Sequence, residues 1–257
     1  MDISNLNTDQ NLFSGEKIGE VLILTLKDKP LLHVTDLSVK KTLFVYLDLV
    51  ACCDDIKVVL VKEAPTKMRR NEYIAFYKSM IGPDIRQRPL ERMYNAIGQL
   101  ILKFVGLNKM VVYADSGDVI LLFMNIGLAC DFRIVADNTV FQNPNLELGV
   151  VPKGASTFLL SKMLGTVKAS RILLSSKGIN AVEARRLCIV DNVVPLNELD
   201  RAALETARSF AQIPTGYAIG VKKLLNYDIK ELAWFLEFEN EMLRKLIQSC
   251  KLYQEIA

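Results

Sequence analysis

The chain has 257 residues, of which 51% are hydrophobic and 24% charged, with 13 glycines and 8 prolines. This composition excludes a disordered, collagen-like or coiled-coil protein, and the length fits one large domain or a core with a small appendage. Lysine and arginine number 32 against 29 acidic residues, and the net charge of +3 is too small to suggest a nucleic acid as partner.

The cysteines and the single histidine limit the possible metal chemistry. No two of the five cysteines have C-x-x-C spacing, and His33 alone cannot complete a Cys/His metal site. We expect reduced, mostly buried thiols in a cytoplasmic protein. Residues 1–19 lack the pattern of a secretory signal, and the longest apolar stretch is interrupted by Asn125, well short of the ~20 residues that span a bilayer. We therefore expect no membrane association.

Apolar periodicity predicts strands and helices that alternate through the first half of the chain. Strands are expected at residues 20–27, 56–61, 110–114 and 132–136, and helices at 37–53, 88–105 and 119–129. From residue 154 the pattern is mainly helical, with long helices at 200–212, 217–226 and 230–251. This order predicts an α/β fold, with a core over residues 1–195 and a helical region over 196–257.

Several common catalytic signatures are absent from the sequence. It contains no G-x-G-x-x-G, no G-x-x-x-x-G-K-[ST], no G-x-S-x-G and no H-E-x-x-H. A Ser/His/Asp triad would have to use His33, and a lone histidine after an apolar strand is more often structural.

Six sequence blocks between residues 128 and 195 carry a family resemblance. They are ACDFRI at 129–134, FQNP at 141–144, LGVVP at 148–152, LG at 164–165, INAVEA at 179–184 and VDNVVP at 190–195. In this order and spacing they resemble the crotonase (enoyl-CoA hydratase/isomerase) superfamily. The resemblance implies a spiral of ββα units and a helical C-terminal region that trimerises, so we expect a homotrimer or hexamer.

The resemblance also implies a ligand and a mechanism. The substrate would be an acyl thioester carried on coenzyme A or on the phosphopantetheine of an acyl-carrier protein, and no other cofactor is required. In this family two backbone N–H groups hold the thioester carbonyl, and two glutamates move protons in the hydratases. The positions that match the two donors are Asn71 and Leu122.

The chain departs from the family pattern at the positions that carry this chemistry. The family's G-G-G-x-E run is replaced by Leu-Leu-Phe-Met-Asn at 121–125, so Asn125 stands where the first glutamate is expected. Asn145 stands at the position of the second glutamate. An amide cannot take up a proton as a general base at pH 7. The family's later G-G-T is replaced by Ala155-Ser156-Thr157, and Lys153 follows Pro152 here.

Two hypotheses follow from these departures. In the first, the protein acts on or binds an acyl thioester in polyketide or fatty-acid type metabolism, as a decarboxylase or isomerase and not as a hydratase. Asn125 and Asn145 would then orient the substrate or water, and Lys153 or His33 would supply a proton. In the second, it is a catalytically inactive crotonase-fold protein that serves as a structural or binding partner.

Three further groups of residues have two interpretations each. Lys67, Arg69 and Arg70 would bind the phosphates of coenzyme A or form an ordinary solvated loop. Asp118 would cap the predicted helix at 119–129 or act as a substitute acid. The aromatic residues Trp234, Phe235 and Phe238 indicate an apolar helix face in the core or at a subunit interface.

Overall fold

The computed structural model describes residues 6–27, 37–64, 67–80 and 87–256. His33 lies outside these ranges, so the two interpretations of this residue remain predictions.

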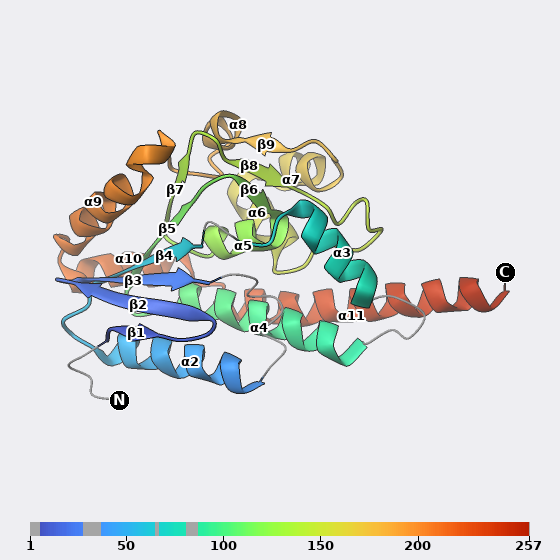
Figure 1. Ribbon diagram of the computed structural model, residues 1–257, viewed down its shortest axis with the longest axis horizontal. Coiled ribbons are helices and arrows are strands. Elements are labelled where there is room, and N and C mark those ends of the chain that lie inside the picture. The colour runs from blue at the N-terminus through green and yellow to red at the C-terminus, as the bar shows by residue number, and fades with distance from the viewer. Residues whose placement is uncertain (1–5, 28–36, 65–66, 81–86, 257) are drawn as a thin grey trace.

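A twisted seven-stranded sheet forms the centre of the molecule (Figure 1). Its order is β1 (Thr8–Asp9), β2 (Phe13–Ile18), β3 (Val21–Leu26), β4 (Val58–Glu63), β5 (Met110–Asp115), β7 (Phe132–Ala136) and β10 (Asn192–Val194). The first three strands pair antiparallel and the rest pair in parallel. β3 and β4 consist mainly of valine, leucine and isoleucine, and β5 is buried at every residue after the first, as expected for a sheet that is covered on both faces.

A second, three-stranded sheet is built from β6 (Asp118–Ile120), β8 (Val140–Gln142) and β9 (Ile179–Asn180). β5 is followed by β6 and then by α5 (Leu121–Leu128), and β7 is followed by β8 and then by α6 (Ser156–Leu164). Each of these two units places one strand in the large sheet, the next in the small sheet, and a helix after them. The repeated order is the ββα unit that the resemblance implies.

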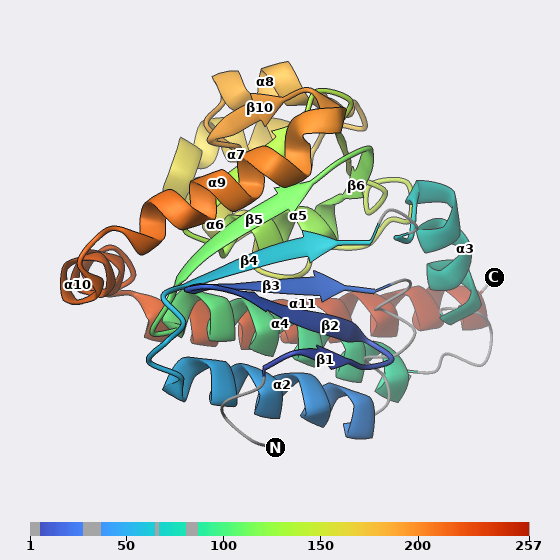
Figure 2. The ribbon, with the colours of Figure 1, turned by 60° about the vertical axis from the view of Figure 1, so that its left-hand side comes forward.

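Helices cover both faces of the large sheet (Figure 2). On one face, α9 (Leu199–Ala211) packs the small side chains of Ala203, Ala207 and Ala211 against the sheet. The other face is covered by a larger apolar cluster that includes α2 (Leu37–Cys52), α4 (Gln87–Gly106) and α5. The remaining helical elements are α3 (Arg70–Met80), α7 (Thr166–Leu173), α8 (Ala181–Arg186), η1 (Leu196–Glu198), α10 (Thr215–Leu225) and α11 (Ile229–Ile256).

The two last helices are joined to the core through buried contacts. α11 packs along α4, and α10 contributes Lys222, whose Nζ donates to the carbonyls of Phe104 and Lys109 and to Asp131 Oδ2. A cation at the last carbonyl groups of α4 is favourable because the C-terminal end of a helix carries partial negative charge. None of the helices in the described ranges is long and apolar enough to cross a bilayer.

Most predicted elements are confirmed, and two elements and one residue role are corrected. The second predicted strand lies at Val58–Glu63, two residues later than expected. The predicted helix at 119–129 begins only at Leu121, because the first residues of that apolar run pair as β6 with β8. Asp118 is therefore an exposed strand residue, and Ile120 occupies the N-cap of α5, so the capping role expected for Asp118 is wrong.

Candidate functional site

The start of α5 is filled by apolar side chains. Leu121, Leu122, Phe123 and Met124 are each at most 3% exposed. Leu122 is the second residue of α5, and the first N–H groups of a helix have no acceptor within it. The backbone at this point therefore offers a donor, while the side chains occupy the space that glycines would leave open.

Asn125 lies one turn later on α5 and is fully buried. Its Nδ2 donates to the Lys153 carbonyl oxygen at 2.7 Å and to Ser156 Oγ at 2.5 Å. Its Oδ1 is buried without a hydrogen-bond partner. The amide thus fastens α5 to the turn before α6, and its chemistry is that of a hydrogen-bonding group with no proton to exchange.

The turn before α6 approaches α5 closely because two consecutive residues adopt left-handed backbone conformations. Gly154 has φ of +77° and Ala155 has φ of 59°. A Cβ atom on Gly154 would lie 3.2 Å from Asn125 Nδ2 and 3.2 Å from Leu122 Cδ1. Only glycine fits at this position without displacing its neighbours.

Asn145 lies in a different part of the site, beside α3. It is 5% exposed, and its Oδ1 accepts a hydrogen bond from Tyr73 Oη at 3.3 Å. It borders an apolar hollow of about 440 Å³ that Val150, Val151 and Leu173 help to line. An ion pair between Arg70 and Glu147 also joins the first turn of α3 to this segment.

Asn71 and the three cations near it are distributed between the surface and the interior. Asn71 is the second residue of α3 and is exposed, and Arg69 is exposed beside it. Arg70 begins the helix α3, so the predicted basic loop ends one residue earlier. Lys67 is only 6% exposed and forms an ion pair with Asp115, so the solvated-loop interpretation is wrong for this residue.

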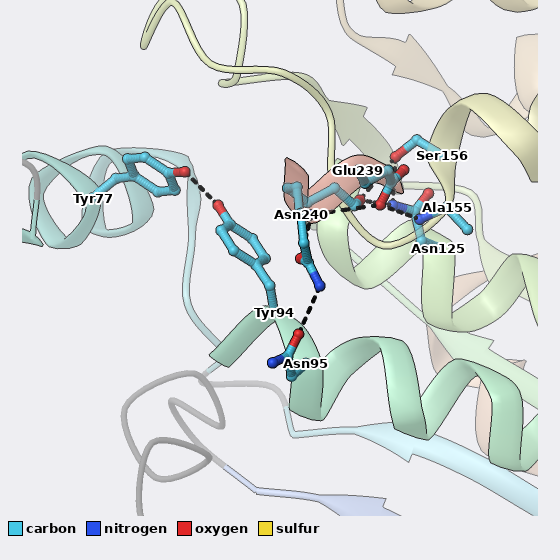
Figure 3. Close-up of polar contacts among 9 residues, drawn as sticks. Tyr77, Tyr94, Asn95, Asn125, Ala155, Ser156, Glu239 and Asn240 are labelled. Atoms are coloured by element: carbon cyan, nitrogen blue, oxygen red, sulfur yellow. Dashed lines mark hydrogen bonds and ion pairs between the residues drawn. The ribbon is translucent and has the colours of Figure 1, made fainter. Parts of the chain in front are cut away.

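Lys153 points away from Asn125 and joins a second group of polar residues on α4 and α11. Its Nζ donates to Asn240 Oδ1 at 2.7 Å, lies 4.0 Å from Glu239 Oε2, and sits 5.2 Å from the centre of the Tyr94 ring. Asn240 in turn donates to Asn95 Oδ1 at 2.8 Å, as Figure 3 shows.

Glu239 connects this group to the turn before α6. Its Oε2 accepts a hydrogen bond from the Ala155 N–H at 3.1 Å, and its Oε1 is buried without a partner. Burial raises the pKa of Glu239 to about 7, although the nearby Lys153 ammonium opposes this effect. Burial also lowers the pKa of Lys153 to about 8, against the attraction of Glu239. Both groups therefore titrate near neutral pH, as acid–base groups of catalytic sites do.

Three tyrosines continue the network from α4 to α3. Tyr94 donates to Tyr77 Oη at 2.5 Å, and the rings of Tyr73 and Tyr77 lie 5.6 Å apart. Burial raises the pKa of Tyr77 to about 12 and raises the pKa of Tyr73 and Tyr94 as well. These hydroxyl groups remain protonated at neutral pH. The three tyrosines lie between Asn145, which accepts from Tyr73, and Lys153, which lies over the Tyr94 ring.

A separate cluster of ionisable groups lies at the carboxyl ends of β4 and β5. Tyr113 Oη donates to Asp115 Oδ2 at 2.6 Å and lies 3.2 Å from Glu63 Oε1, and Lys67 forms an ion pair with Asp115. Burial, together with the Asp115 carboxylate, raises the pKa of Glu63 to about 8. Among the residues that the structure describes, His, Cys, Asp and Glu form no group of three that could hold a metal ion.

Glu239 and Asn240 were not predicted from the sequence, although a signal for them exists. The buried stripe of α11 contains Leu232, Leu236 and Leu243 at helical spacing, and the two polar residues occupy the same stripe. A carboxylate and an amide inside an apolar stripe indicate a buried polar contact with another element. Trp234 lies off this stripe and is 65% exposed, so it does not belong to the core.

Comparisons with known proteins all point to one family. The model of the enoyl-CoA hydratase/isomerase family matches residues 87–255. A short-chain-enoyl-CoA hydratase of Clostridium acetobutylicum is 25% identical over 88% of this chain and 85% of its own length. A crotonyl-CoA hydratase of Syntrophomonas wolfei is 31% identical over 49% of this chain and 46% of its own length. The chain thus spans about half the length of some curated relatives that it matches.

Solved structures share the fold. An enoyl-CoA hydratase from Bacillus halodurans superposes with a TM-score of 0.78 at 20% identity, covering 92% of this chain and 95% of that chain. An enoyl-CoA hydratase from Bacillus anthracis gives a TM-score of 0.74 at 20% identity, covering 95% and 96% of the two chains. The crotonase-like spiral of ββα units is therefore the fold of this chain as well.

Proposed function

Since the chain belongs to the enoyl-CoA hydratase/isomerase family, we propose that it binds an acyl thioester and does not hydrate it. The observation that carries this proposal is the state of Asn125. Its amide is buried and donates two hydrogen bonds within the protein at the position where the resemblance places a proton-transferring glutamate. Asn145, at the second such position, is likewise an amide that accepts from Tyr73. Hydration of an enoyl thioester needs a base for water, and neither amide can serve as one.

The thioester carbonyl would be held by the backbone N–H groups of Asn71 and Leu122. Each is the second residue of a helix, where N–H groups lack intrahelical acceptors and the helix dipole favours negative charge. The apolar hollow beside Asn145 would take the acyl chain. Arg69 and Arg70 lie next to Asn71, where they would meet the phosphates of coenzyme A or phosphopantetheine.

Loss of carbon dioxide fits these groups better than hydration, because it needs no base, whereas migration of a double bond also requires a base to remove a proton from carbon. In decarboxylation of a malonyl-type thioester, the C–C bond electrons move into an enolate that the two N–H groups stabilise, and a proton donor then quenches the carbanion. Lys153, the donor expected from the sequence, points its ammonium group away from Asn125 and toward Asn240, so a water molecule would have to supply this proton.

The experiment that tests this proposal measures binding and turnover separately. Acetyl-, butyryl-, crotonyl- and malonyl-CoA are added to the purified protein, and stabilisation of about 2.7 kcal/mol is expected at 100 times the dissociation constant. Crotonyl-CoA is expected to bind without forming the hydroxyacyl product. Rapid hydration of crotonyl-CoA would contradict the proposal.

The packing of α5 favours a second function, that of a catalytically inactive partner. Four apolar side chains fill the start of this helix, and Leu122 Cδ1 lies against Gly154. If these side chains exclude the thioester, no acyl-CoA and no acyl-carrier protein thioester will stabilise the protein. The same binding experiment thus separates the two functions.

A further inference from the structure

A cavity of about 440 Å³ lies between α4 and α11, on the side of the Lys153–Gly154 turn that faces these two helices. Such a volume is within the range of small-molecule sites. Figure 3 shows several polar side chains converging on it from α4 and α11. Its polar lining residues are Tyr94, Asn95, Gln99, Lys153, Glu237, Glu239 and Asn240. The rest of the lining includes apolar side chains of both helices, among them Leu102, Leu236 and Trp234.

Two polar groups in this cavity have unused hydrogen-bonding capacity. Lys153 Nζ carries up to three donors and makes one hydrogen bond, to Asn240 Oδ1, while Glu239 Oε2 is 4.0 Å away. Glu239 is 5% exposed, and its Oε1 has no partner although it is buried. A buried oxygen without a partner is costly, so the cavity offers an open donor and an open acceptor a few ångströms apart.

We propose that this cavity binds a small monocarboxylic acid with an apolar tail, held at its carboxyl group by Lys153 and Glu239. One oxygen of the ligand accepts a hydrogen bond from Lys153 Nζ. The other shares a proton with Glu239 Oε1. The tail lies along Leu102, Leu236 and Trp234. This inference goes beyond the proposed function and does not require a thioester at α5.

The charges balance in this arrangement. In the free protein the Lys153 ammonium faces the Glu239 carboxylate. In the complex the ammonium faces two carboxyl groups that share one proton, so the net charge of Lys153, Glu239 and the ligand together remains zero, and Glu237 in the lining is not changed by binding. Binding of a carboxylate therefore takes up a proton above pH 7, since the pKa of Glu239 is about 7. The other charged groups that act on Lys153 are Glu237 and Arg244 of α11 and Glu91 of α4.

The chain provides its own reporter for the test. It has one tryptophan, Trp234, and this residue lines the cavity. Hexanoate is titrated into the full-length protein at pH 6.5 and 8.0, with hexanamide, hexanol and hexylamine as matched ligands. A saturable change in Trp234 fluorescence is expected with hexanoate alone. The affinity for hexanoate should fall several-fold from pH 6.5 to pH 8.0, by up to about tenfold per pH unit for one proton taken up. No change with hexanoate, or equal binding of hexanamide, would overturn the proposal.

Variants at the two polar residues then assign their roles. Lys153→Met should weaken hexanoate binding at least about tenfold, because it removes the charge-assisted donor. Glu239→Gln keeps an N–H donor for the ligand and should still bind hexanoate. The proton uptake on hexanoate binding, measured by calorimetry in two buffers, should largely disappear in this variant. Glu241→Gln, an exposed neighbour on α11, is the control and should match the wild type.

A measurement on the wild-type protein keeps the test independent of variant folding. With carboxyl-labelled ¹³C-hexanoate, the bound carboxyl resonance should be shifted from that of the free carboxylate and should exchange with the free signal. A free-ligand resonance that stays unchanged at saturating protein concentration would refute the site even if the variants fail to fold.

Discussion

Glu63 is protonated at neutral pH in the folded protein, because burial and the Asp115 carboxylate raise its pKa from 4.5 to about 8. Burial also raises the pKa of Glu239, to about 7. Between pH 4.5 and these values the folded state holds protons that the unfolded chain has released. Raising the pH through this window therefore favours unfolding. Lys153 has the opposite effect on stability, and only above pH 8. Its pKa is lowered to about 8 in the folded protein, so above this pH the unfolded chain holds a proton that the folded protein has released.

We expect Glu63→Gln to flatten this pH dependence. The free energy of unfolding of the wild type should fall by about 3–4 kcal/mol more than that of the variant between pH 5 and pH 8, at about 1.4 kcal/mol per pH unit between the two pKa values. Urea denaturation at the two pH values measures the difference. Glu241→Gln removes an exposed carboxylate and should leave the slope unchanged. Parallel slopes for wild type and Glu63→Gln would contradict the assignment.

At this scale the sequence singles out candidate site residues but not their partners. Asn125 and Asn145 became candidates because the neighbouring blocks have fixed spacing, and the structure buries both. The pairing of Lys67 with Asp115 joins residues 48 positions apart, and Lys153 meets Asn240 across 87 positions. Contacts of this range depend on how helices pack on the sheet, which no local pattern encodes.

The junction between α5 and α6 is the element on which the site geometry depends. We expect Gly154→Ala to destabilise the protein by about 1–3 kcal/mol, because the added methyl group meets Asn125 and Leu122 and φ is positive. Gly220→Ala, in the interior of α10 with open space around it, is the matched control and should stabilise by about 0.5–1 kcal/mol. Thermal unfolding of both variants measures the contrast. A neutral Gly154→Ala would show that this turn is free to rearrange.

Elements with a single periodicity were predicted well, and short or mixed ones were not. The alternating and continuous apolar runs of β3, β5 and β7 identify strands, and the long amphipathic run of α4 identifies a helix. The run at 119–129 is apolar throughout, so its pattern cannot show that three residues pair as β6 before α5 begins. α3 was missed because its mixed charged and aromatic sequence has low overall hydrophobicity.

At the scale of the whole molecule, α10 and the residues just after it expose apolar side chains. Four large side chains there are at least 65% exposed, namely Tyr217, Leu224, Leu225 and Tyr227. Clustered exposed apolar residues indicate a surface that another protein covers. With the trimer implied by the sequence resemblance, we expect a second copy of this chain to be that protein.

This expectation can be tested by sedimentation. The wild type should sediment as an oligomer at micromolar concentration. The double variant Leu224→Glu, Leu225→Glu should have a dissociation constant at least about tenfold higher than that of the wild type. Val182→Glu alters a similarly exposed side chain on α8 and should leave the assembly intact. A monomeric wild type would contradict the expectation.

The placement of Glu239 on α11 also has a consequence for biosynthesis. A ribosome makes the sheet, α5 and the Lys153 turn well before it makes the helix that supplies Glu239 and Asn240. Until then the nascent polypeptide carries a lysine and an amide N–H in its interior with these acceptors missing. The interior around Lys153 can therefore be completed only after α11 has been made, and a chain shortened before residue 229 would lack both acceptors.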